Sequence, residues 1–342
     1  MTDTTPTTGD DEDSLGDLID DGPGIGLSLE ERLRGKVRVL SSLVWEQAVE
    51  DEDLERWLEN FRGEVCDAET ERLLALHLLT HFTYFGVREI RVLLRSLYRD
   101  HLRYPIVQSI RSEFNGTTDH TLIAERLDEE LLATRFLGVG NPSESGPHLL
   151  YYFRQENGLP SQLFVQEHEL LSDDRRSLAF PNVRRLVFLD DLLASGTQAT
   201  RFGRRVLTDV VAAAKDAGQT LEIIYLVLFA KADGVDSVLN AKCGFDDIRP
   251  LHVINDSELA FADQSRCFVS APSGIDRDQT QAVASHYGAQ LFPQHPLGFG
   301  DGQLLLGFHH NIPNNSLPVF WTDEIDSAWS AVFPRYEKRR TL

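Results

Sequence analysis

The feature of the sequence that most constrains its fold is the segment 186–198, which reads LVFLDDLLASGTQ. Four apolar residues precede two aspartates and a loop of small residues. Such an apolar run is typical of a strand that is buried on both faces of a parallel sheet. Apolar positions at helical spacing then predict a long helix over 199–217, which ends before Gly218. The segment therefore predicts a strand–loop–helix unit of an open α/β sheet.

The residues around this unit show the same alternation of short apolar runs and helical patterns. Strands are predicted over 134–139, 163–166, 185–189, 221–229, 248–254 and 304–309, and helices over 147–156 and 234–241. The succession up to residue 254 favours a parallel sheet covered by helices.

The chain before this α/β part has a helical pattern. Residues 1–24 hold eight acidic residues and no basic ones, which predicts a disordered acidic tail over 1–25. Ser28 and Glu31 form a capping-box pattern at a helix start. Further helices are predicted over 53–61, 67–85 and 87–103. We thus expect a helical N-terminal region over 26–130, an α/β domain over 131–325 and a C-terminal extension over 326–342.

Composition places the chain among globular proteins and limits its partners. Hydrophobic residues make up 42% and charged residues 25% of the chain. No apolar stretch is long enough to span a membrane, and we expect a cytoplasmic protein. The formal net charge is −21, and only five of the 33 basic residues are lysines, which fits a surface solvated in strong salt, as in a halophile. This charge disfavours nonspecific nucleic-acid binding, and no clear nucleic-acid site is found.

The aspartates and the small loop lie where open α/β sheets bind ligands, beyond the carboxyl ends of the strands. Free backbone amides at a helix N-terminus donate hydrogen bonds to a phosphate, and Gly196 lets the backbone approach that phosphate closely. Ser195 and Thr197 add hydroxyl donors. Asp190 and Asp191 offer acceptors to two ribose hydroxyls, and carboxylates also favour Mg²⁺ together with substrate phosphates. We therefore predict a ribose-phosphate site with Mg²⁺.

This segment resembles the phosphoribosyl pyrophosphate (PRPP) signature of type I phosphoribosyltransferases, in which two acids and a short spacer precede Ser or Thr with Gly. The resemblance implies an α/β fold of phosphoribosyltransferase type, with a doubly wound, mainly parallel sheet. It implies that Asp190 and Asp191 are catalytic residues and metal ligands. The residues implied to bind the 5′-phosphate are Ala194, Ser195, Gly196, Thr197 and Gln198. The pyrophosphate loop is implied to lie within 137–146, where Gly138, Gly140 and Asn141 present amides.

Two positions depart from the pattern of the purine-salvage members. Those members carry a third acid where this chain has Ala194, and a hydroxyl residue where it has Gln198. Salvage of hypoxanthine-like bases is therefore disfavoured, while ribose and phosphate binding are still expected.

A narrower resemblance is to PRTase-CE, a phosphoribosyltransferase-like family associated with prokaryotic conflict systems. It rests on the helical N-terminal region, on the Asp-Asp-x-x-x-Ser-Gly-Thr-Gln loop at 190–198, and on Gly- and Asn-rich segments at 298–301 and 310–315. The resemblance implies a role in defence against phage or other invading elements.

A C-terminal segment adds candidate base-binding residues. Amide side chains can hydrogen-bond to the edge of a base, and aromatic rings can stack on its face. One interpretation is therefore a hood segment that covers a nucleobase with Asn314, Asn315 and Trp321. The alternative is a turn-rich connection between elements. His309 and His310 as a metal site are disfavoured, because adjacent strand side chains point to opposite faces.

Charged residues elsewhere leave two interpretations open. One face of the predicted 87–103 helix carries Arg91, Arg95 and Arg99. This face either pairs with local acids or contacts a partner protein of a defence operon. Arg154 and Arg201 are predicted near the phosphate loops, as diphosphate clamps or as surface ion pairs. Residues 167–169, Glu-His-Glu, are either exposed loop residues or an acid–base group at the cleft.

Three functions remain open from the sequence. The first is an enzyme with Mg²⁺-dependent chemistry at ribose C1′ of PRPP or of a nucleotide. The second is a non-catalytic PRPP or nucleotide sensor or interaction module, and the third is a structural protein that keeps the fold without a ligand. A nucleoside triphosphatase is excluded, because the chain has no Gly-x-x-x-x-Gly-Lys-Ser/Thr loop.

Overall fold

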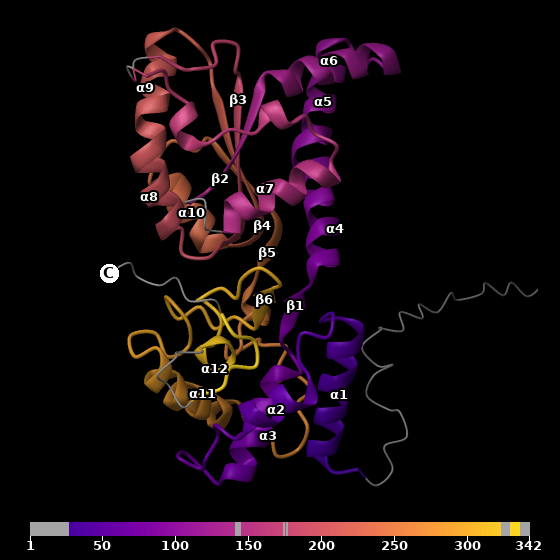
Figure 1. The fold of residues 1–342 in the computed structure, drawn as a ribbon, viewed down its shortest axis with the longest axis vertical. Coiled ribbons are helices and arrows are strands. Elements are labelled where there is room, and N and C mark those ends of the chain that lie inside the picture. Colours follow the sequence, from indigo (N-terminus) through magenta and orange to yellow (C-terminus); the bar gives the residue numbers. More distant parts are fainter. Residues whose placement is uncertain (1–26, 141–144, 174, 176, 323–328, 336–342) are drawn as a thin grey trace, which may run out of the picture.

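The computed structural model describes residues 27–140, 145–173, 175, 177–322 and 329–335, and its described strands form two parallel sheets. The larger sheet has the order β2-β3-β4-β5, and the smaller one pairs β1 with β6 (Figure 1). The strands are β1 (Thr83–Phe85), β2 (Thr134–Gly138), β3 (Arg185–Leu193), β4 (Glu222–Lys231), β5 (Asp247–Ile254) and β6 (Leu306–Phe308). Neighbours in the larger sheet follow one another in the chain, so a crossover connects each strand to the next.

Helices cover both faces of the larger sheet, as the sequence predicts. The connecting helices are α7 (Ser145–Glu156), α8 (Thr197–Phe202), the π-helical turn η4 (Gly203–Leu207), α9 (Thr208–Asp216) and α10 (Ala232–Asn240). Leu149 of α7 packs in one core with Val187 and Leu189 of β3. Phe202 of α8 packs with Phe188 in another core. The sheet is therefore doubly wound, with α7 on one face and α8 to α10 on the other.

The remaining helices divide between the sheet and a second core. These helices are α1 (Leu29–Leu43), α2 (Asp51–Leu58), α3 (Ala68–Leu79), α4 (Val87–Tyr98), α5 (Tyr104–Glu113), α6 (His120–Leu132), α11 (Arg277–Leu291) and α12 (Pro318–Trp321). Shorter helical turns are η1 (Arg99–Arg103), η2 (Ser161–Leu163), η3 (Glu167–Glu169) and η5 (Asp256–Glu258). We call residues 87–254 the sheet lobe, and residues 27–85 with the described residues of 256–335 the lower lobe (Figure 1).

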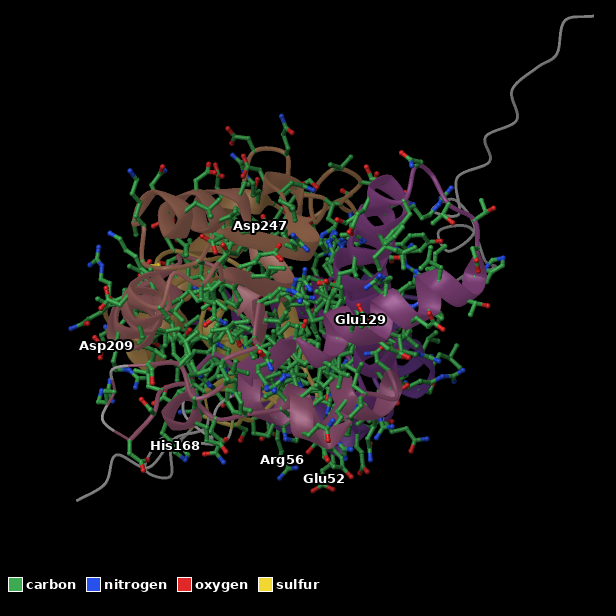
Figure 2. The ribbon with its side chains drawn as sticks, turned by 90° about the horizontal axis from the view of Figure 1, so that it is seen from above. Glu52, Arg56, Glu129, His168, Asp209 and Asp247 are labelled. Atoms are coloured by element: carbon green, nitrogen blue, oxygen red, sulfur yellow. The ribbon has the colours of Figure 1, made fainter. Side chains whose placement is uncertain are left out.

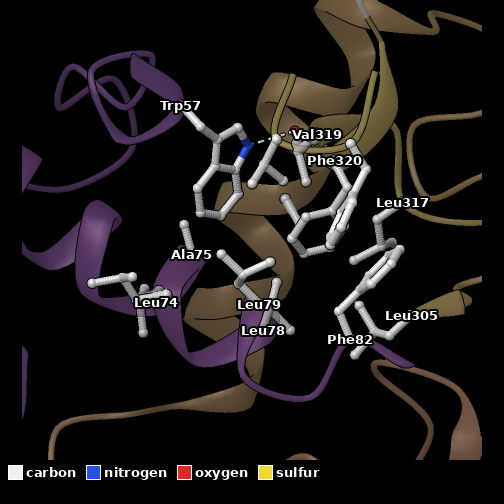
Figure 3. Packing of buried hydrophobic residues seen from close by; sticks show 14 of the residues in the cluster. Trp57, Leu74, Ala75, Leu78, Leu79, Phe82, Leu305, Leu317, Val319 and Phe320 are labelled. Carbon is white, nitrogen blue, oxygen red and sulfur yellow. Dashed lines mark hydrogen bonds between the residues drawn. The ribbon is translucent and has the colours of Figure 1, made fainter. Parts of the chain in front are cut away.

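The two ends of the described chain pack together in the lower lobe. Trp57 of α2 stacks on Phe320 of α12, with ring centroids 5.5 Å apart, and its Nε1 donates a hydrogen bond of 2.7 Å to the carbonyl oxygen of Val319 (Figure 3). Leu74 and Leu78 of α3 lie in the same cluster. The predicted domain boundaries stay predictions, and this core adds that α1 to α3 share their packing with the C-terminal helices.

Several local predictions are confirmed. Ser28 and Glu31 form the capping box of α1, because the Ser28 amide donates to Glu31 Oε2 at 2.7 Å and the Glu31 amide donates to Ser28 Oγ at 3.2 Å. The predicted 87–103 helix is continuous through α4 and η1. The predicted helix after the small loop runs through α8, η4 and α9 to Asp216.

Two element predictions are wrong, and a third is confirmed over a shorter range. Residues 163–166 are not a strand, because Pro160 precedes the helical turn η2 and Phe164 alone makes an isolated bridge, to Phe136 of β2. Residues 83–85, predicted as a helix end, form β1, which suits their β-branched and aromatic side chains. The strand predicted over 304–309 is confirmed over a shorter range as β6, which pairs with β1.

Many charged side chains lie on the outside of the molecule. His168 and Asp209 are exposed and lie near the edge of the molecule in the view from above (Figure 2). Within the described part of the chain, no helix combines the length and apolarity needed to cross a bilayer.

Glu71 of α3 is a buried carboxylate that ties three segments of the lower lobe together. Its oxygens accept hydrogen bonds from the amides of Gly63 at 2.7 Å and Val65 at 2.6 Å, and from the Tyr287 hydroxyl of α11 at 2.6 Å. Burial alone would raise the pKa of this carboxyl, but the hydrogen bonds from Tyr287 and the backbone amides outweigh burial and lower the pKa. The carboxylate is therefore ionised in the fold and stabilises it.

We predict that Glu71→Gln lowers the free energy of unfolding by about 2–3 kcal/mol, because an amide has one acceptor oxygen for several donors. Denaturant titration measures this loss, and Glu69→Gln on the exposed face of the same helix is the matched control. Since the folded pKa is depressed, the contribution of Glu71 is present above the unfolded pKa and is lost as the pH falls through the folded pKa. An equal effect of both substitutions at pH 7 would contradict this role.

Candidate functional site

The two aspartates lie inside β3, not at its end. The sequence predicts that the strand stops at residue 189, but Leu192 and Leu193 continue the ladder, opposite Phe229 and Ala230 of β4. Successive strand side chains point to opposite faces of a sheet. Asp190 therefore lies on the face that α8 to α10 cover, and Asp191 lies on the face of α4 and α7. The two carboxylates therefore point to opposite faces, and they do not present their acceptors side by side to two ribose hydroxyls.

Asp190 is held by a tyrosine of the neighbouring strand. Its Oδ2 accepts a hydrogen bond of 2.8 Å from the Tyr225 hydroxyl, and its Oδ1 accepts one of 3.0 Å from the Asp191 amide. Burial, and then the negative charge of Asp190, raises the pKa of Tyr225 well above its usual value. The phenol is therefore protonated at neutral pH and donates to the carboxylate.

Asp191 faces the lower lobe. Its Oδ2 lies 3.1 Å from His310 Nε2, and the His310 ring stacks on Phe308 with centroids 5.5 Å apart. Burial lowers the pKa of the Arg335 guanidinium, and the nearby charge of Asp191 acts in the opposite direction. Asp190 is 5% exposed and Asp191 4%, so both charges depend on such partners.

The small loop is bent tightly against α10. Gly196 has φ of 74°, a left-handed conformation that suits glycine, and it caps α8. A Cβ at Gly196 would lie 2.8 Å from the Gly234 carbonyl oxygen, and a Cβ at Gly234 would overlap the Ala194 carbonyl oxygen. The Ser195 and Thr197 hydroxyls lie 3.0 Å apart at the loop surface. The loop conformation therefore depends on two glycines from different elements.

A cavity of about 520 Å³ opens at the carboxyl end of β3, between the two lobes. It collects most of the residues that the sequence singles out. The residues that both line this cavity and belong to the predicted site are Gly140, Asp190, Ala194, Ser195, Gly196, Thr197, Gln198, Asn314 and Asn315. Ligand sites of this size are common in proteins, and this one has the position expected for an open α/β sheet.

Two predicted site residues do not line the cavity, and a third is not among the described residues. Gly138 ends β2, where it pairs with Leu189, and it does not line the cavity. Asp191 is next to the cavity residue Asp190 but contacts His310. Asn141 lies outside the described residues.

The predicted hood segment is fixed by its neighbours in the lower lobe. The Asn315 Nδ2 donates a hydrogen bond of 2.9 Å to the carbonyl oxygen of Phe299, and the Phe299 amide donates one of 2.7 Å to the Asn314 carbonyl oxygen. Gly298 and Gly302 pack so closely on Asn315 that a Cβ at either would overlap it. The Gly-rich 298–301 segment thus holds the asparagines at the cavity wall.

The predicted arginine stripe is paired with local acids. Arg91 Nη1 lies 2.9 Å from Glu156 and Arg95 Nε lies 3.5 Å from the same carboxylate. Arg99 pairs with Asp100 at 2.7 Å. The contact between this stripe and a partner protein stays a prediction.

The Glu-His-Glu segment and the paired histidines also have defined places. Glu167 accepts two hydrogen bonds from Arg205, at 2.7 and 2.8 Å, while His168 is exposed. His309 neither faces Asp191 nor finds a hydrogen-bond partner among the described residues, and its ring lies against Tyr152. Burial, and then the charges of His310 and His148, lowers the pKa of His309 to about 4.

Whether the cavity residues could hold a magnesium ion depends on which oxygen and nitrogen ligands they offer. Among the described residues, no group of three or more His, Cys, Asp or Glu side chains is arranged to hold a metal by itself. Mg²⁺ in proteins commonly keeps several waters and binds through one or two carboxylates plus substrate phosphates. Asp190, a carboxylate on the cavity wall, fits that type of coordination.

Sequence reasoning missed Tyr225 and Gly234 as residues that position the site. It also missed that His310 contacts Asp191. One signal was present for Tyr225, because a buried tyrosine in an otherwise apolar strand needs a hydrogen-bond partner. Gly234 stands in the first turn of α10, where a glycine costs helix stability unless close packing requires it.

Comparison with known proteins identifies the family. The PRTase-CE family model matches residues 54–335. Orotate phosphoribosyltransferase from Aeropyrum pernix is 18% identical, with 40% of this chain and 72% of that chain covered and a TM-score of 0.22. The AQ2163 protein from Aquifex aeolicus is 13% identical, with 62% and 89% covered and a TM-score of 0.27. No curated protein sequence matches. Because the family model spans most of its length, the chain belongs to the PRTase-CE family.

Proposed function

We propose that this protein binds a 5′-phosphorylated ribose, as PRPP or as a nucleotide, in the cavity at the carboxyl end of β3. One observation carries the proposal. A carboxylate for ribose hydroxyls, a glycine-bent loop at a helix start and two asparagines line the same cavity, although they come from distant parts of the chain. Each group suits a different part of one nucleotide.

The parts of the ligand are assigned by their chemistry. The 5′-phosphate lies on the loop Ala194 to Gln198, whose amides and hydroxyls begin a helix that continues to Asp216. A ribose hydroxyl donates to Asp190, which Tyr225 orients. The amides of Asn314 and Asn315 face the base, and Gly140 lies on the side proposed for a pyrophosphate. Asp191 lies on the other face of β3, where it contacts His310 and lies near the Arg335 guanidinium.

We also propose that the protein performs chemistry at ribose C1′. The bond from C1′ to pyrophosphate or to a base breaks, the leaving group takes the electron pair, and a base or water bonds to C1′ and loses a proton. Positive charge develops on the ribose ring, and the buried carboxylate of Asp190 stabilises it. A bound Mg²⁺ would neutralise part of the negative charge on the phosphates. The alternative is a sensor that binds the same ligand without turnover.

Finally, we propose that the protein works in prokaryotic defence. This proposal is supported by membership of PRTase-CE, a family that is associated with conflict systems.

The first prediction concerns ligand binding. In calorimetric titration in molar KCl, we expect the wild type to bind Mg²⁺–PRPP or a 5′-nucleotide, and Asp190→Asn to bind at least about tenfold more weakly, because a charge-assisted hydrogen bond is lost. Asp216→Asn, an exposed carboxylate at the end of α9, is the matched control and should bind as the wild type does. If the folded wild type binds neither PRPP nor common 5′-nucleotides, the proposal fails.

The same proteins separate an enzyme from a sensor. We assay release of pyrophosphate or free base with and without Mg²⁺. Turnover that is lost in Asp190→Asn and in Asp191→Asn supports the enzyme, whereas binding without turnover supports the sensor.

A second prediction tests the loop. Gly234→Ala should weaken nucleotide binding by about tenfold or more, because the added Cβ overlaps the Ala194 carbonyl oxygen and displaces the phosphate loop. Gly35→Ala in α1 meets no atom within 4 Å and should leave affinity unchanged. Thermal unfolding of both variants checks that they fold. Equal affinities of the two folded variants would show that the loop does not depend on this contact.

The defence role predicts a phenotype. Cells that express the protein with its gene neighbours should resist phage, and Asp190→Asn should abolish the resistance at equal expression level. Full protection by the variant in a plaque assay would separate any defence role from this site.

A further inference from the structure

A second groove adjoins the proposed nucleotide cavity. It has a volume of about 570 Å³ and is lined by Thr197, Thr200, Arg201, Arg204, Arg205 and Ser237. Thr197, Arg201 and Arg205 also line the first cavity, so the two spaces share a wall at the phosphate loop. A ligand that reaches Thr197 in the cavity can therefore continue into the groove.

The groove carries a row of positive charge. Thr197, Thr200, Arg201 and Arg204 follow helical spacing of three to four residues, so they lie along one face of the helix that begins at the loop. At 1.5 Å per residue, the row extends about 10 Å away from the loop. The side chains of Arg201 and Arg204 are exposed. Arg205 is anchored by its two hydrogen bonds to Glu167.

This row is unusual in its setting. The chain has a net charge of −21, yet three arginines occur within five residues on the groove wall. A ligand with a terminal 5′-phosphate would end at the loop and leave Arg201 and Arg204 without an anion. The pyrophosphate of PRPP is on C1′ and is proposed to lie near Gly140, on another part of the cavity wall. The groove therefore suits phosphates that continue from the 5′ position.

We propose that the groove binds the outer phosphates of a nucleotide whose 5′-phosphate carries at least one further phosphate. This inference rests on the proposed function, because it takes the 5′-phosphate at the loop as its starting point. Guanidinium groups pair with phosphate oxygens through two parallel hydrogen bonds, which suits Arg201 and Arg204 for a polyphosphate. The same chemistry occurs in a free nucleoside triphosphate and in a diphosphate that is capped by a second ribose.

The test compares ligands that differ only beyond the 5′-phosphate. Calorimetry at fixed free Mg²⁺ and fixed salt gives the dissociation constants of AMP, ADP, ATP and ADP-ribose for three proteins. These are the wild type, Arg201→Ala/Arg204→Ala, and the control Arg88→Ala/Arg103→Ala, which removes two exposed arginines from α4 and η1. Thermal unfolding confirms that each variant is folded.

We expect the wild type and the control to bind ATP or ADP-ribose about tenfold or more tightly than AMP, and the groove variant to bind ATP and ADP-ribose no more tightly than it binds AMP. Preference for ATP identifies a free polyphosphate, and preference for ADP-ribose identifies a capped diphosphate. If AMP binds but the wild type shows no such ratio, or the groove variant keeps it, the inference is wrong and the proposed function stands. If no nucleotide binds the wild type, the inference is wrong, and the proposed function fails as well if PRPP does not bind either.

Discussion

The alternation of side chains along β3 is the constraint on which the site depends. The apolar residues 186–189 bury the strand in two cores, so the aspartates that follow must point to opposite faces. A buried carboxylate without a partner is strongly destabilising, and each face supplies one. Tyr225 of the next strand donates to Asp190, while His310 of the lower lobe contacts Asp191. The two adjacent acids thus have different roles, because Asp190 lies on the cavity wall and Asp191 connects the two lobes through His310.

The joining of the lobes determines the shape of the cavity. One wall comes from β3 and its loop, and the opposite wall comes from Phe299, Asn314 and Asn315. Phe308 of β6 packs in the core of the sheet lobe with Phe229, and the ring centroids are 5.6 Å apart. Because this apolar contact lies just before His310 and the asparagines, it fixes where the hood segment meets the sheet. The fold therefore positions the proposed base-binding groups through hydrophobic packing rather than through flexible loops.

The sequence predicted the parts of the site whose signals are local. The apolar run of β3, the small loop and the following helix are contiguous, and their position in an open sheet implies a cavity beyond them. The pairing of β1 with β6 was not predictable, because Thr83 and Leu306 are distant in the chain and both strands are short. The contact of Gly234 with Ala194 and that of His310 with Asp191 likewise exist only after the elements have packed. Local patterns indicate where the cavity lies, whereas the residues that orient the groups on its wall come from tertiary contacts.

An acidic surface and an anionic ligand are compatible because the relevant forces act over different ranges. The long-range repulsion from a net charge of −21 is screened within about 3 Å in molar salt. Direct contacts between guanidinium and phosphate groups are shorter than this screening length and survive. The guanidinium of arginine is more weakly hydrated than the ammonium of lysine, and its hydrogen-bond donors lie in one plane. Arginine therefore loses less hydration free energy when it pairs with a phosphate. A cluster such as Arg201, Arg204 and Arg205 can therefore select a polyanion within an acidic protein, provided that the ligand is already placed by the neighbouring loop.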